Sequence, residues 1–355
     1  MKSPPMEING FLRKGIKDLR PYQVPAVSCP IKLDAHENPY PLPARLRAKV
    51  EKVMADLPLN RYPDSGATKL RQAIAAYTGL ESNWITVGNG SDELIQSIML
   101  AFGEALIYPE PTFDMYPILA KVTGLSLKGI PLGDDFILDE EAIIRTAKEN
   151  RASLIFISSP NNPTGNIFPR ERIERIIVES GSLVVCDEAY YEFSGESFIS
   201  HLARYENLII LRTLSKLGLA GLRVGYMLAS PSIIREINKV RLPYNLNTVS
   251  QEIATLVLTD FEPIKRQIKE IIAQREEVYQ CLKTMPGLNP FPSRTNFILM
   301  RSHLLGADYI WNELVKAGIL IKNLNQAGAL RNCLRVSIGT PEENKAVTSV
   351  LSRII

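Results

Sequence analysis

The chain has 355 residues, enough for a large domain and a smaller one, and apolar residues make up 45% of it. It carries 41 basic and 38 acidic residues without a block of like charges, which argues against a disordered chain and against a nucleic-acid-binding protein. No apolar stretch of about 18 residues is present, and residues 1–10 lack the apolar core of a signal peptide, so we expect a cytoplasmic protein without a membrane segment.

Cysteine and histidine residues are scattered and show no metal-ligand spacing. They are Cys29, Cys186, Cys281 and Cys333, and His36, His201 and His303. The sequence therefore predicts neither a disulfide framework nor a metal site.

Residues 1–30 are irregular and rich in proline, and they predict an N-terminal arm. A large domain is expected over 31–245, where helical and strand patterns alternate. Its expected helices are 44–56, 66–78 and 91–102, and its expected strands are 84–87, 105–108, 154–157, 183–186, 208–211 and 224–228. Most of these strands are apolar on both faces, which is typical of a mostly parallel central sheet flanked by helices.

The pattern changes after about residue 245 and predicts a smaller α/β C-terminal domain over 246–355. The elements expected there are a long helix at 261–285, a strand at 296–300, a helix at 307–317, strands at 320–322 and 333–338, and a helix at 341–354.

The first candidate site segment follows the strand expected at 84–87. Residues 88–92 read Gly-Asn-Gly-Ser-Asp and lead into a helix. Glycines let backbone N–H groups approach an anion, and a helix N-terminus favours negative charge, so this segment could cradle a phosphate. By itself the pattern is weak, because many such turns bind nothing.

Three more segments follow expected strands. The loop SSPNNPTG at 158–165 presents asparagine, DEAY at 187–190 presents a carboxylate beside a tyrosine, and 212–223 places Lys216 between hydroxyl residues and an arginine. Taken singly, these could be a plain turn, a salt-bridged acid and a surface lysine.

Together the four segments point to one ligand, because the carboxyl ends of the strands of an open α/β sheet form a common binding edge. They supply a phosphate cradle, an amide, a carboxylate and a lysine that an apolar pocket can make nucleophilic toward an aldehyde. These are the groups that pyridoxal 5′-phosphate (PLP) requires: a phosphate site, partners for its ring hydroxyl and ring nitrogen, and a Schiff-base lysine.

With these segments the chain resembles the aspartate-aminotransferase-like, fold type I family of PLP-dependent enzymes. The hallmark segments are SPNNPTG at 159–165, CDEAY at 186–190, and TLSK at 213–216 with Gly225. Within that family the chain is most similar to the histidinol-phosphate aminotransferases, through LDAHENP at 33–39, RYPD at 61–64, GSDE at 90–93, and CLRV at 333–336 followed by Gly339 and Thr340. The resemblance covers nearly the whole chain.

The resemblance implies a role for each matching residue. Lys216 would bind the cofactor covalently and move the proton, and Asp187 would keep the ring nitrogen protonated. Asn162 and Tyr190 would hydrogen-bond the ring hydroxyl. The residues implied around the cofactor phosphate are Gly90, Ser91, Asp92, Thr213, Ser215 and Arg223, with Phe113 on the ring face; those implied toward the substrate are Tyr22, Tyr62, Asn162 and Arg335. Tyr62 would reach the cofactor phosphate of a neighbouring subunit, which implies a homodimer with shared active sites.

The implied reaction is the reversible ping-pong transfer of an amino group between L-glutamate and imidazole-acetol phosphate, which gives L-histidinol phosphate. An aromatic amino acid aminotransferase, which has the same cofactor shell, remains an alternative. So does a threonine-phosphate decarboxylase, which shares this fold and also binds a phosphorylated substrate.

Two departures from the family pattern bear on the site. The run from Lys216 to Arg223 is one residue shorter than the usual form, so the loop must be rebuilt around Arg223. Lys322 stands where arginine is common in the histidinol-phosphate group, and it replaces a planar fork with a point charge. Arg331 is a candidate to compensate.

Overall fold

The computed structural model describes residues 10–13, 15–17, 19–21 and 27–355, and it contains two sheets. The larger sheet has seven strands in the order β2 (Ile85–Asn89), β8 (Val224–Ala229), β7 (Leu208–Thr213), β6 (Leu183–Asp187), β5 (Leu154–Ser158), β3 (Ala105–Glu110) and β4 (Ser126–Pro131). Only β8 runs antiparallel to its neighbours. The mostly parallel sheet expected from the sequence is therefore present.

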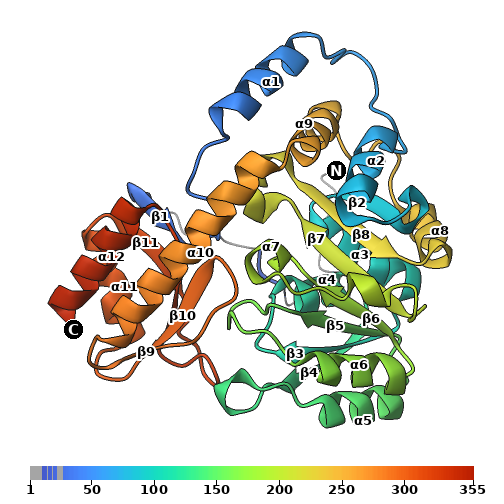
Figure 1. Cartoon of the computed structure of the whole chain (residues 1–355). Helices are drawn as coiled ribbons and strands as arrows, with labels where there is room; N and C mark the ends of the chain where they lie inside the picture. The colour runs from blue at the N-terminus through green and yellow to red at the C-terminus, as the bar shows by residue number, and fades with distance from the viewer. Residues whose placement is uncertain (1–9, 14, 18, 22–26) are drawn as a thin grey trace, which may run out of the picture.

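Helices cover both faces of this sheet (Figure 1). One face packs against α3 (Ser91–Phe102), α4 (Met115–Thr123) and α8 (Pro231–Val240). The other packs against α2 (Thr68–Thr78), α5 (Glu140–Asn150), α6 (Arg170–Glu179), α7 (Tyr191–Ser194) and α9 (Thr248–Thr259). Along β7, Leu208 and Ile210 enter one core while Ile209 and Leu211 enter the other, which explains why the strand is apolar at every position.

The smaller sheet has five strands in the order β1 (Ile31–Leu33), β11 (Ile319–Asn323), β12 (Cys333–Ser337), β10 (Phe297–Ser302) and β9 (Leu288–Pro290). Its helices are α11 (Ala307–Lys316) and α12 (Pro341–Ile354), and the long α10 (Glu262–Lys283) runs between the two units in Figure 1. The apolar core on one face of the large sheet continues into this unit. The remaining helix, α1 (Ala44–Ala55), contacts α9.

The expected boundary at residue 31 differs from the observed architecture. Ile31–Leu33 pairs in parallel with β11 and so belongs to the smaller sheet, although the sequence placed it in the large domain. A strand of 3 residues is too short to show a period, and only pairing with a distant segment reveals it. The helix expected from residue 66 begins instead at Thr68, because the Asp64 carboxylate accepts hydrogen bonds from the amides of Gly66 and Thr68 and forms a turn.

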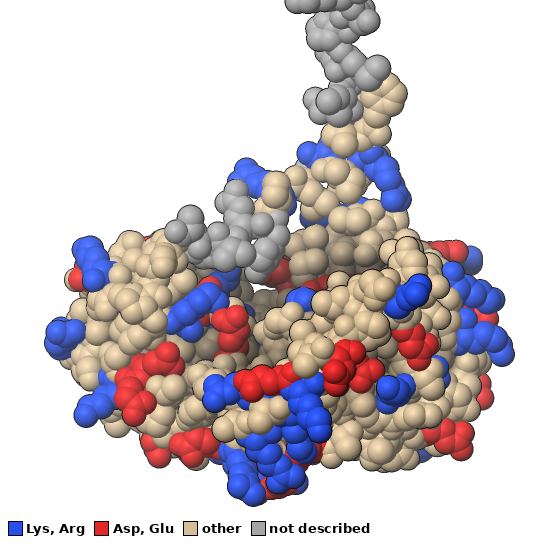
Figure 2. Space-filling model, turned by 90° about the horizontal axis from the view of Figure 1, so that it is seen from above, with Lys and Arg blue, Asp and Glu red and all other residues tan. Residues whose placement is uncertain are grey.

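The molecular surface carries mixed charge. Figure 2 shows a face that is hollowed near its middle, with basic and acidic side chains interspersed across it. Among the described residues, no helix is both long enough and apolar enough to cross a membrane.

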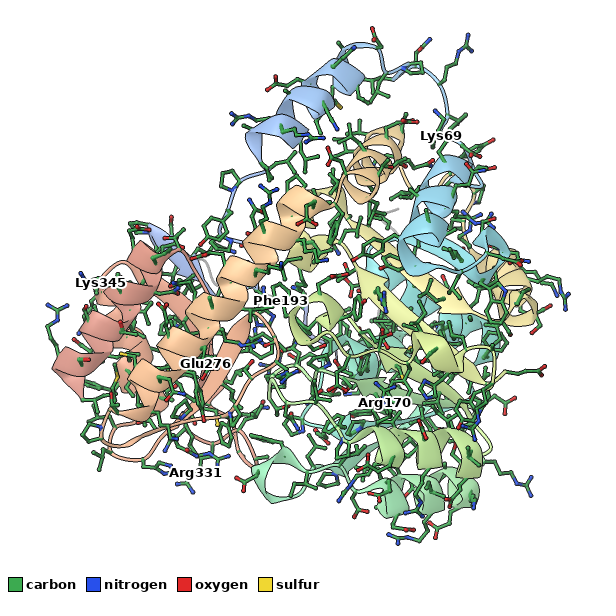
Figure 3. All side chains as sticks on the ribbon, viewed as in Figure 1. Lys69, Arg170, Phe193, Glu276, Arg331 and Lys345 are labelled. Atoms are coloured by element: carbon green, nitrogen blue, oxygen red, sulfur yellow. The ribbon has the colours of Figure 1, made fainter. Side chains whose placement is uncertain are left out.

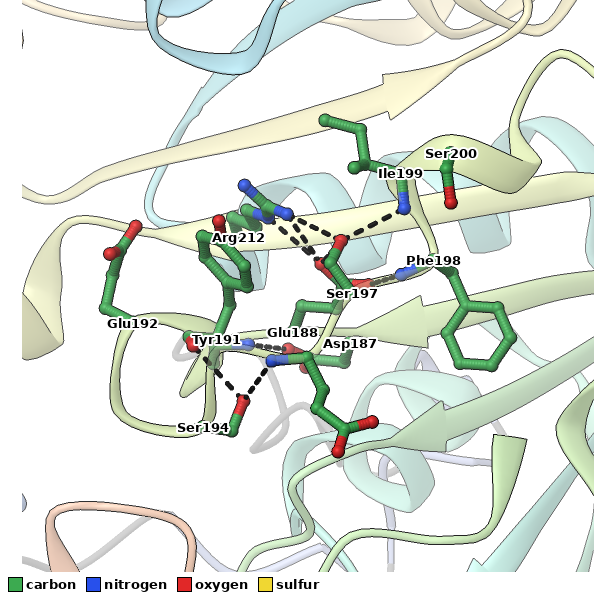
Figure 4. A network of polar contacts seen from close by, with 12 residues as sticks. Asp187, Glu188, Tyr191, Glu192, Ser194, Ser197, Phe198, Ile199, Ser200 and Arg212 are labelled. Atoms are coloured by element: carbon green, nitrogen blue, oxygen red, sulfur yellow. Dashed lines mark hydrogen bonds and ion pairs between the residues drawn. The ribbon is translucent and has the colours of Figure 1, made fainter.

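A buried ion pair ties the ends of two central strands together (Figure 4). Glu188 follows β6 and is 2% exposed, and Arg212 near the end of β7 is 4% exposed. Arg212 donates to Glu188 Oε2 from Nε at 3.0 Å and from Nη2 at 2.9 Å, and its guanidinium lies 3.6 Å from the ring centroid of Tyr191. The Ser197 hydroxyl and the Phe198 amide also donate to the Glu188 carboxylate, so both of its oxygens have partners.

Removing one charge of this pair should destabilise the fold strongly. In Glu188→Gln the buried Arg212 loses its counter-charge, and we expect the free energy of unfolding to fall by about 3–5 kcal/mol in urea titrations. Glu196→Gln is the matched control, because Glu196 and Arg170 form an exposed ion pair at 3.7 Å. That variant should change stability by no more than about 0.5 kcal/mol. Equal effects of the two substitutions would contradict a structural role for the buried pair.

Candidate active site

The carboxyl ends of β2, β5, β6 and β7 lie at one edge of the large sheet. β2 and β7 are both antiparallel to β8 and therefore point the same way, and β5 and β6 run parallel to β7. All four segments singled out in the sequence follow these strand ends. The sheet topology thus brings them to a common edge, as expected.

The residues expected to cradle a phosphate at the start of α3 lie close together. Gly90 has φ +82° and precedes the helix, and a Cβ on it would lie 2.7 Å from Arg223 Nη2. A Cβ on Gly225 would lie 2.5 Å from the amide nitrogen of Ser91, so only glycine allows β8 to approach the helix start this closely. Arg223 Nη2 also donates to Asp92 Oδ2 at 3.2 Å.

Two hydroxyl groups from the β7 loop complete this cradle. The Thr213 hydroxyl donates to Ser215 Oγ at 3.0 Å, and Arg223 Nη1 lies 3.4 Å from the same Ser215 oxygen. Although the loop from Lys216 to Arg223 is shorter than the family form, two short 3-10 helices, η5 (Ser215–Leu217) and η6 (Ala220–Leu222), span it and leave Arg223 at the cradle. A helix N-terminus, two hydroxyls and a guanidinium suit a phosphate.

Asp187 is buried without a basic group among the partners that the structure gives its carboxylate. Its carboxylate accepts from the Tyr116 hydroxyl at 2.7 Å and from the Ala189 amide at 3.0 Å. Burial raises the pKa of Asp187 to about 6, although both hydrogen bonds lower it. A protonated ring nitrogen would supply the missing positive charge, so this carboxylate fits the pyridine nitrogen of PLP.

Tyr116 is a site residue that the sequence reasoning missed. It lies in α4, and its ring meets that of Phe113 edge-on at 5.6 Å between centroids. Phe113, expected on the face of the cofactor ring, therefore contacts the tyrosine whose hydroxyl donates to Asp187. The sequence did contain a signal: Phe113 and Tyr116 are three residues apart at the start of a helix, a spacing that lets two side chains meet.

Lys216 lies half-buried beside the smaller unit, where its Nζ donates to the Ala35 carbonyl at 3.3 Å. Burial, together with the positive charge of Arg335, lowers the pKa of Lys216 to about 8. A larger fraction of this amine is therefore neutral near physiological pH than in an ordinary lysine, and a neutral amine can attack an aldehyde.

Arg335 and Asn162 join the two units at the site. Arg335 lies on β12, is 8% exposed, and donates from Nη1 to Asn162 Oδ1 and from Nη2 to the Asp34 carbonyl at 3.2 Å. Lys322 on β11 pairs with Arg335 across the sheet. Because directly paired residues point to the same face, the two cations lie side by side and suit an anionic substrate group.

Two expected residues lie away from this group, and a third cannot be placed. Tyr62 is 82% exposed and stacks on Tyr244 with 4.5 Å between ring centroids. Arg331 lines a separate cavity of about 450 Å³ with Arg301 and His303, at the lower edge of the smaller unit in Figure 3, and does not compensate for Lys322. Tyr22 lies outside the described residues.

The pKa of Lys216 predicts how cofactor attachment depends on pH. When PLP is added to cofactor-free protein, the rate at which the absorption band of the lysine-bound cofactor appears should rise about tenfold per pH unit below pH 8 and level off above it. Stopped-flow absorbance between pH 6.5 and 9.5 measures this, and Lys216→Ala should give no band. A midpoint near the ordinary lysine pKa would show that the pocket does not activate the amine.

Comparison with known proteins agrees with this geometry. Residues 29–351 match the class I and II aminotransferase family. Histidinol-phosphate aminotransferase 2 of Nitrosococcus oceani is 42% identical over 347 residues, which cover 96% of each chain.

Solved structures give the same result. The histidinol-phosphate aminotransferase of Clostridium acetobutylicum has a TM-score of 0.85 at 25% identity, covering 91% of this chain and 98% of that one. The enzyme of Sinorhizobium meliloti, solved in complex with pyridoxal 5′-phosphate, has a TM-score of 0.84 at 26% identity, covering 92% and 91%. The expected fold class and cofactor are thereby confirmed, and the chain belongs to the class I and II aminotransferases and, within them, to the histidinol-phosphate aminotransferase family.

Proposed function

We propose that the protein is a cytoplasmic histidinol-phosphate aminotransferase that moves an amino group reversibly between L-glutamate and imidazole-acetol phosphate, giving L-histidinol phosphate. The observation that carries this proposal is the cationic pair Lys322 and Arg335 beside the activated amine of Lys216. Both amino-group donors carry an anion near the amine-bearing carbon: glutamate has two carboxylates, and histidinol phosphate has a phosphate ester in place of an α-carboxylate. Two adjacent cations form an anion-binding site that either substrate can use.

The cofactor supplies an aldehyde and an electron-withdrawing ring that stabilises negative charge at the substrate carbon. Lys216 Nζ would hold the cofactor, and as a free amine it would take up and release the proton at the substrate carbon. A lysine with a pKa of about 8 can take up and release that proton near neutral pH.

The remaining residues bind and orient. The Asp187 carboxylate would hold the proton on the ring nitrogen. Asn162 and Tyr190 would bind the ring hydroxyl, and Phe113 would cover the ring face. The residues around the phosphate would be Gly90, Ser91, Asp92, Thr213, Ser215 and Arg223.

Arg335 lies next to Asn162 and so places the substrate anion close to the ring.

Single-turnover absorbance on the PLP-loaded protein tests the substrate assignment. L-Histidinol phosphate and L-glutamate should each remove the lysine-bound cofactor band quickly, and L-phenylalanine should do so slowly. In Arg335→Gln the rate with both good substrates should fall by roughly 10- to 100-fold, the value of a hydrogen bond to a charged group. Arg331→Gln is the matched control and should retain the original rates. Fast conversion with phenylalanine and none with histidinol phosphate would instead indicate an aromatic aminotransferase.

A homodimer with shared active sites forms part of the proposal. Tyr62 and Tyr244 stack on each other, and exposed apolar residues lie close to them in the sequence: Leu59 is 70% exposed and Leu242 is 68% exposed. Exposed apolar side chains near one another are typical of surfaces that bind another chain. Tyr62 would then serve the cofactor phosphate of the partner subunit.

Light scattering on the full chain should therefore give twice the mass of one chain. Tyr62→Phe removes one hydroxyl and should weaken PLP binding by roughly 5- to 10-fold without changing the mass, since a single hydrogen bond contributes about 1 kcal/mol. Tyr309→Phe, at another exposed tyrosine, should leave PLP affinity unchanged. A monomeric mass would contradict the shared site.

A further inference from the structure

His36 is a buried histidine for which the site described above has no role. It is 3% exposed and lies between the two units, in the segment that follows β1. Its Nδ1 lies 2.7 Å from the hydroxyl of Tyr190, the residue assigned to the ring hydroxyl of the cofactor. Its Nε2 is buried and makes no hydrogen bond with any of the described residues.

The imidazole is held rigidly by the smaller sheet. The His36 amide donates to Ser337 Oγ at 3.0 Å, and Asn296 Nδ2 donates to the His36 carbonyl at 3.0 Å. The ring stacks on Phe297 with 4.2 Å between centroids and 21° between planes. The backbone sits at φ +57°, where histidine is tolerated better than most residues. Residues of the smaller unit therefore fix the position of His36 against Tyr190 of the large unit.

Burial and the charges around the ring set its protonation state. Burial holds the pKa of His36 well below the ordinary value, and the positive charges of Arg335, Lys216 and Lys322 lower it further. The ring is therefore neutral and carries one proton. A proton on Nε2 would leave a buried N–H without an acceptor among these cations, whereas a bare Nε2 lone pair is attracted to them. The electrostatics thus favour the proton on Nδ1.

The state of Tyr190 completes the argument. Burial raises the pKa of its hydroxyl, so it stays protonated and has one proton to donate. If His36 Nδ1 lacked a proton, that hydroxyl would donate to His36 and could not donate to the cofactor.

We propose that His36 is a positioning residue: its neutral imidazole donates from Nδ1 to the Tyr190 hydroxyl oxygen, and so directs the Tyr190 proton to the ring oxygen of the bound cofactor. This inference rests on the proposed role of Tyr190 and extends it. The chain of donors runs from the smaller unit through His36 and Tyr190 to the cofactor. Through this chain, the position of the smaller unit would influence how much negative charge the cofactor ring oxygen carries.

The first test reads the proton directly. In the full chain, the 3 histidines give few ¹⁵N imidazole signals, and the signal lost in His36→Phe identifies His36. We expect a neutral ring with its proton on Nδ1 from pH 6 to pH 8, both without and with PLP. A proton on Nε2, or an imidazolium at neutral pH, would overturn the proposal.

The second test follows the pH at which the absorption band of the lysine-bound cofactor changes. The Tyr190 hydroxyl, by donating to the ring oxygen of the cofactor, would reduce the negative charge on that oxygen. This negative charge otherwise retains the proton on the nitrogen that joins Lys216 to the cofactor. His36→Phe keeps the ring stack but removes the N–H that directs the Tyr190 hydroxyl to the ring oxygen, so the midpoint should rise by roughly 0.5–1 pH unit. His36→Asn tolerates the backbone and places an amide N–H near the position of Nδ1, so it should restore the original midpoint.

A double-mutant cycle separates positioning from packing. In a Tyr190→Phe background, His36→Phe should shift the midpoint by less than about 0.2 unit, because the hydroxyl through which it acts is absent. An equal shift in both backgrounds would mean that His36 is only structural. These readouts are independent of the substrate: if histidinol phosphate is not converted, the proposed function fails while the titration still decides the role of His36.

Discussion

The buried ion pair between Glu188 and Arg212 is the constraint on which the site depends. Asp187 precedes Glu188 at the end of β6, and Thr213 follows Arg212 at the end of β7, so the pair fixes both strand ends from the side opposite the cofactor groups. Adjacent residues along a strand point to opposite faces. A charge pair buried on one side can therefore hold a carboxylate and a hydroxyl in place on the other.

The site is completed from two units that share one core. The larger sheet contributes the cradle, Asp187 and Lys216, and the smaller sheet contributes Arg335 and Lys322. Contacts between these groups are direct: Arg335 donates to Asn162, and His36 meets Tyr190 at 2.7 Å. The groups proposed to bind the cofactor and the substrate are therefore linked, and a displacement of the smaller unit would change both together.

Sequence patterns located the strands and the segments at their ends well. Helix 91–102 and helix 341–354 have the predicted bounds, because a glycine precedes the first, and a threonine capping box with proline at the first turn starts the second. The expected strand ends fell one or two residues short, since Asp187 and Thr213 are polar and yet remain in the ladder. Tyr116 was missed because its partner is 71 residues away.

The sequence by itself determined the buried parallel strands, the order of the cofactor segments and the lysine that the family requires, because these depend on local periodicity and on short motifs. The tertiary structure decided what depends on distant segments meeting. It placed Ile31–Leu33 in the smaller sheet, set Lys322 beside Arg335, moved Arg331 to another cavity and brought His36 to Tyr190. No local pattern encodes these contacts, because pairing register and burial arise only when the two sheets pack against a common core.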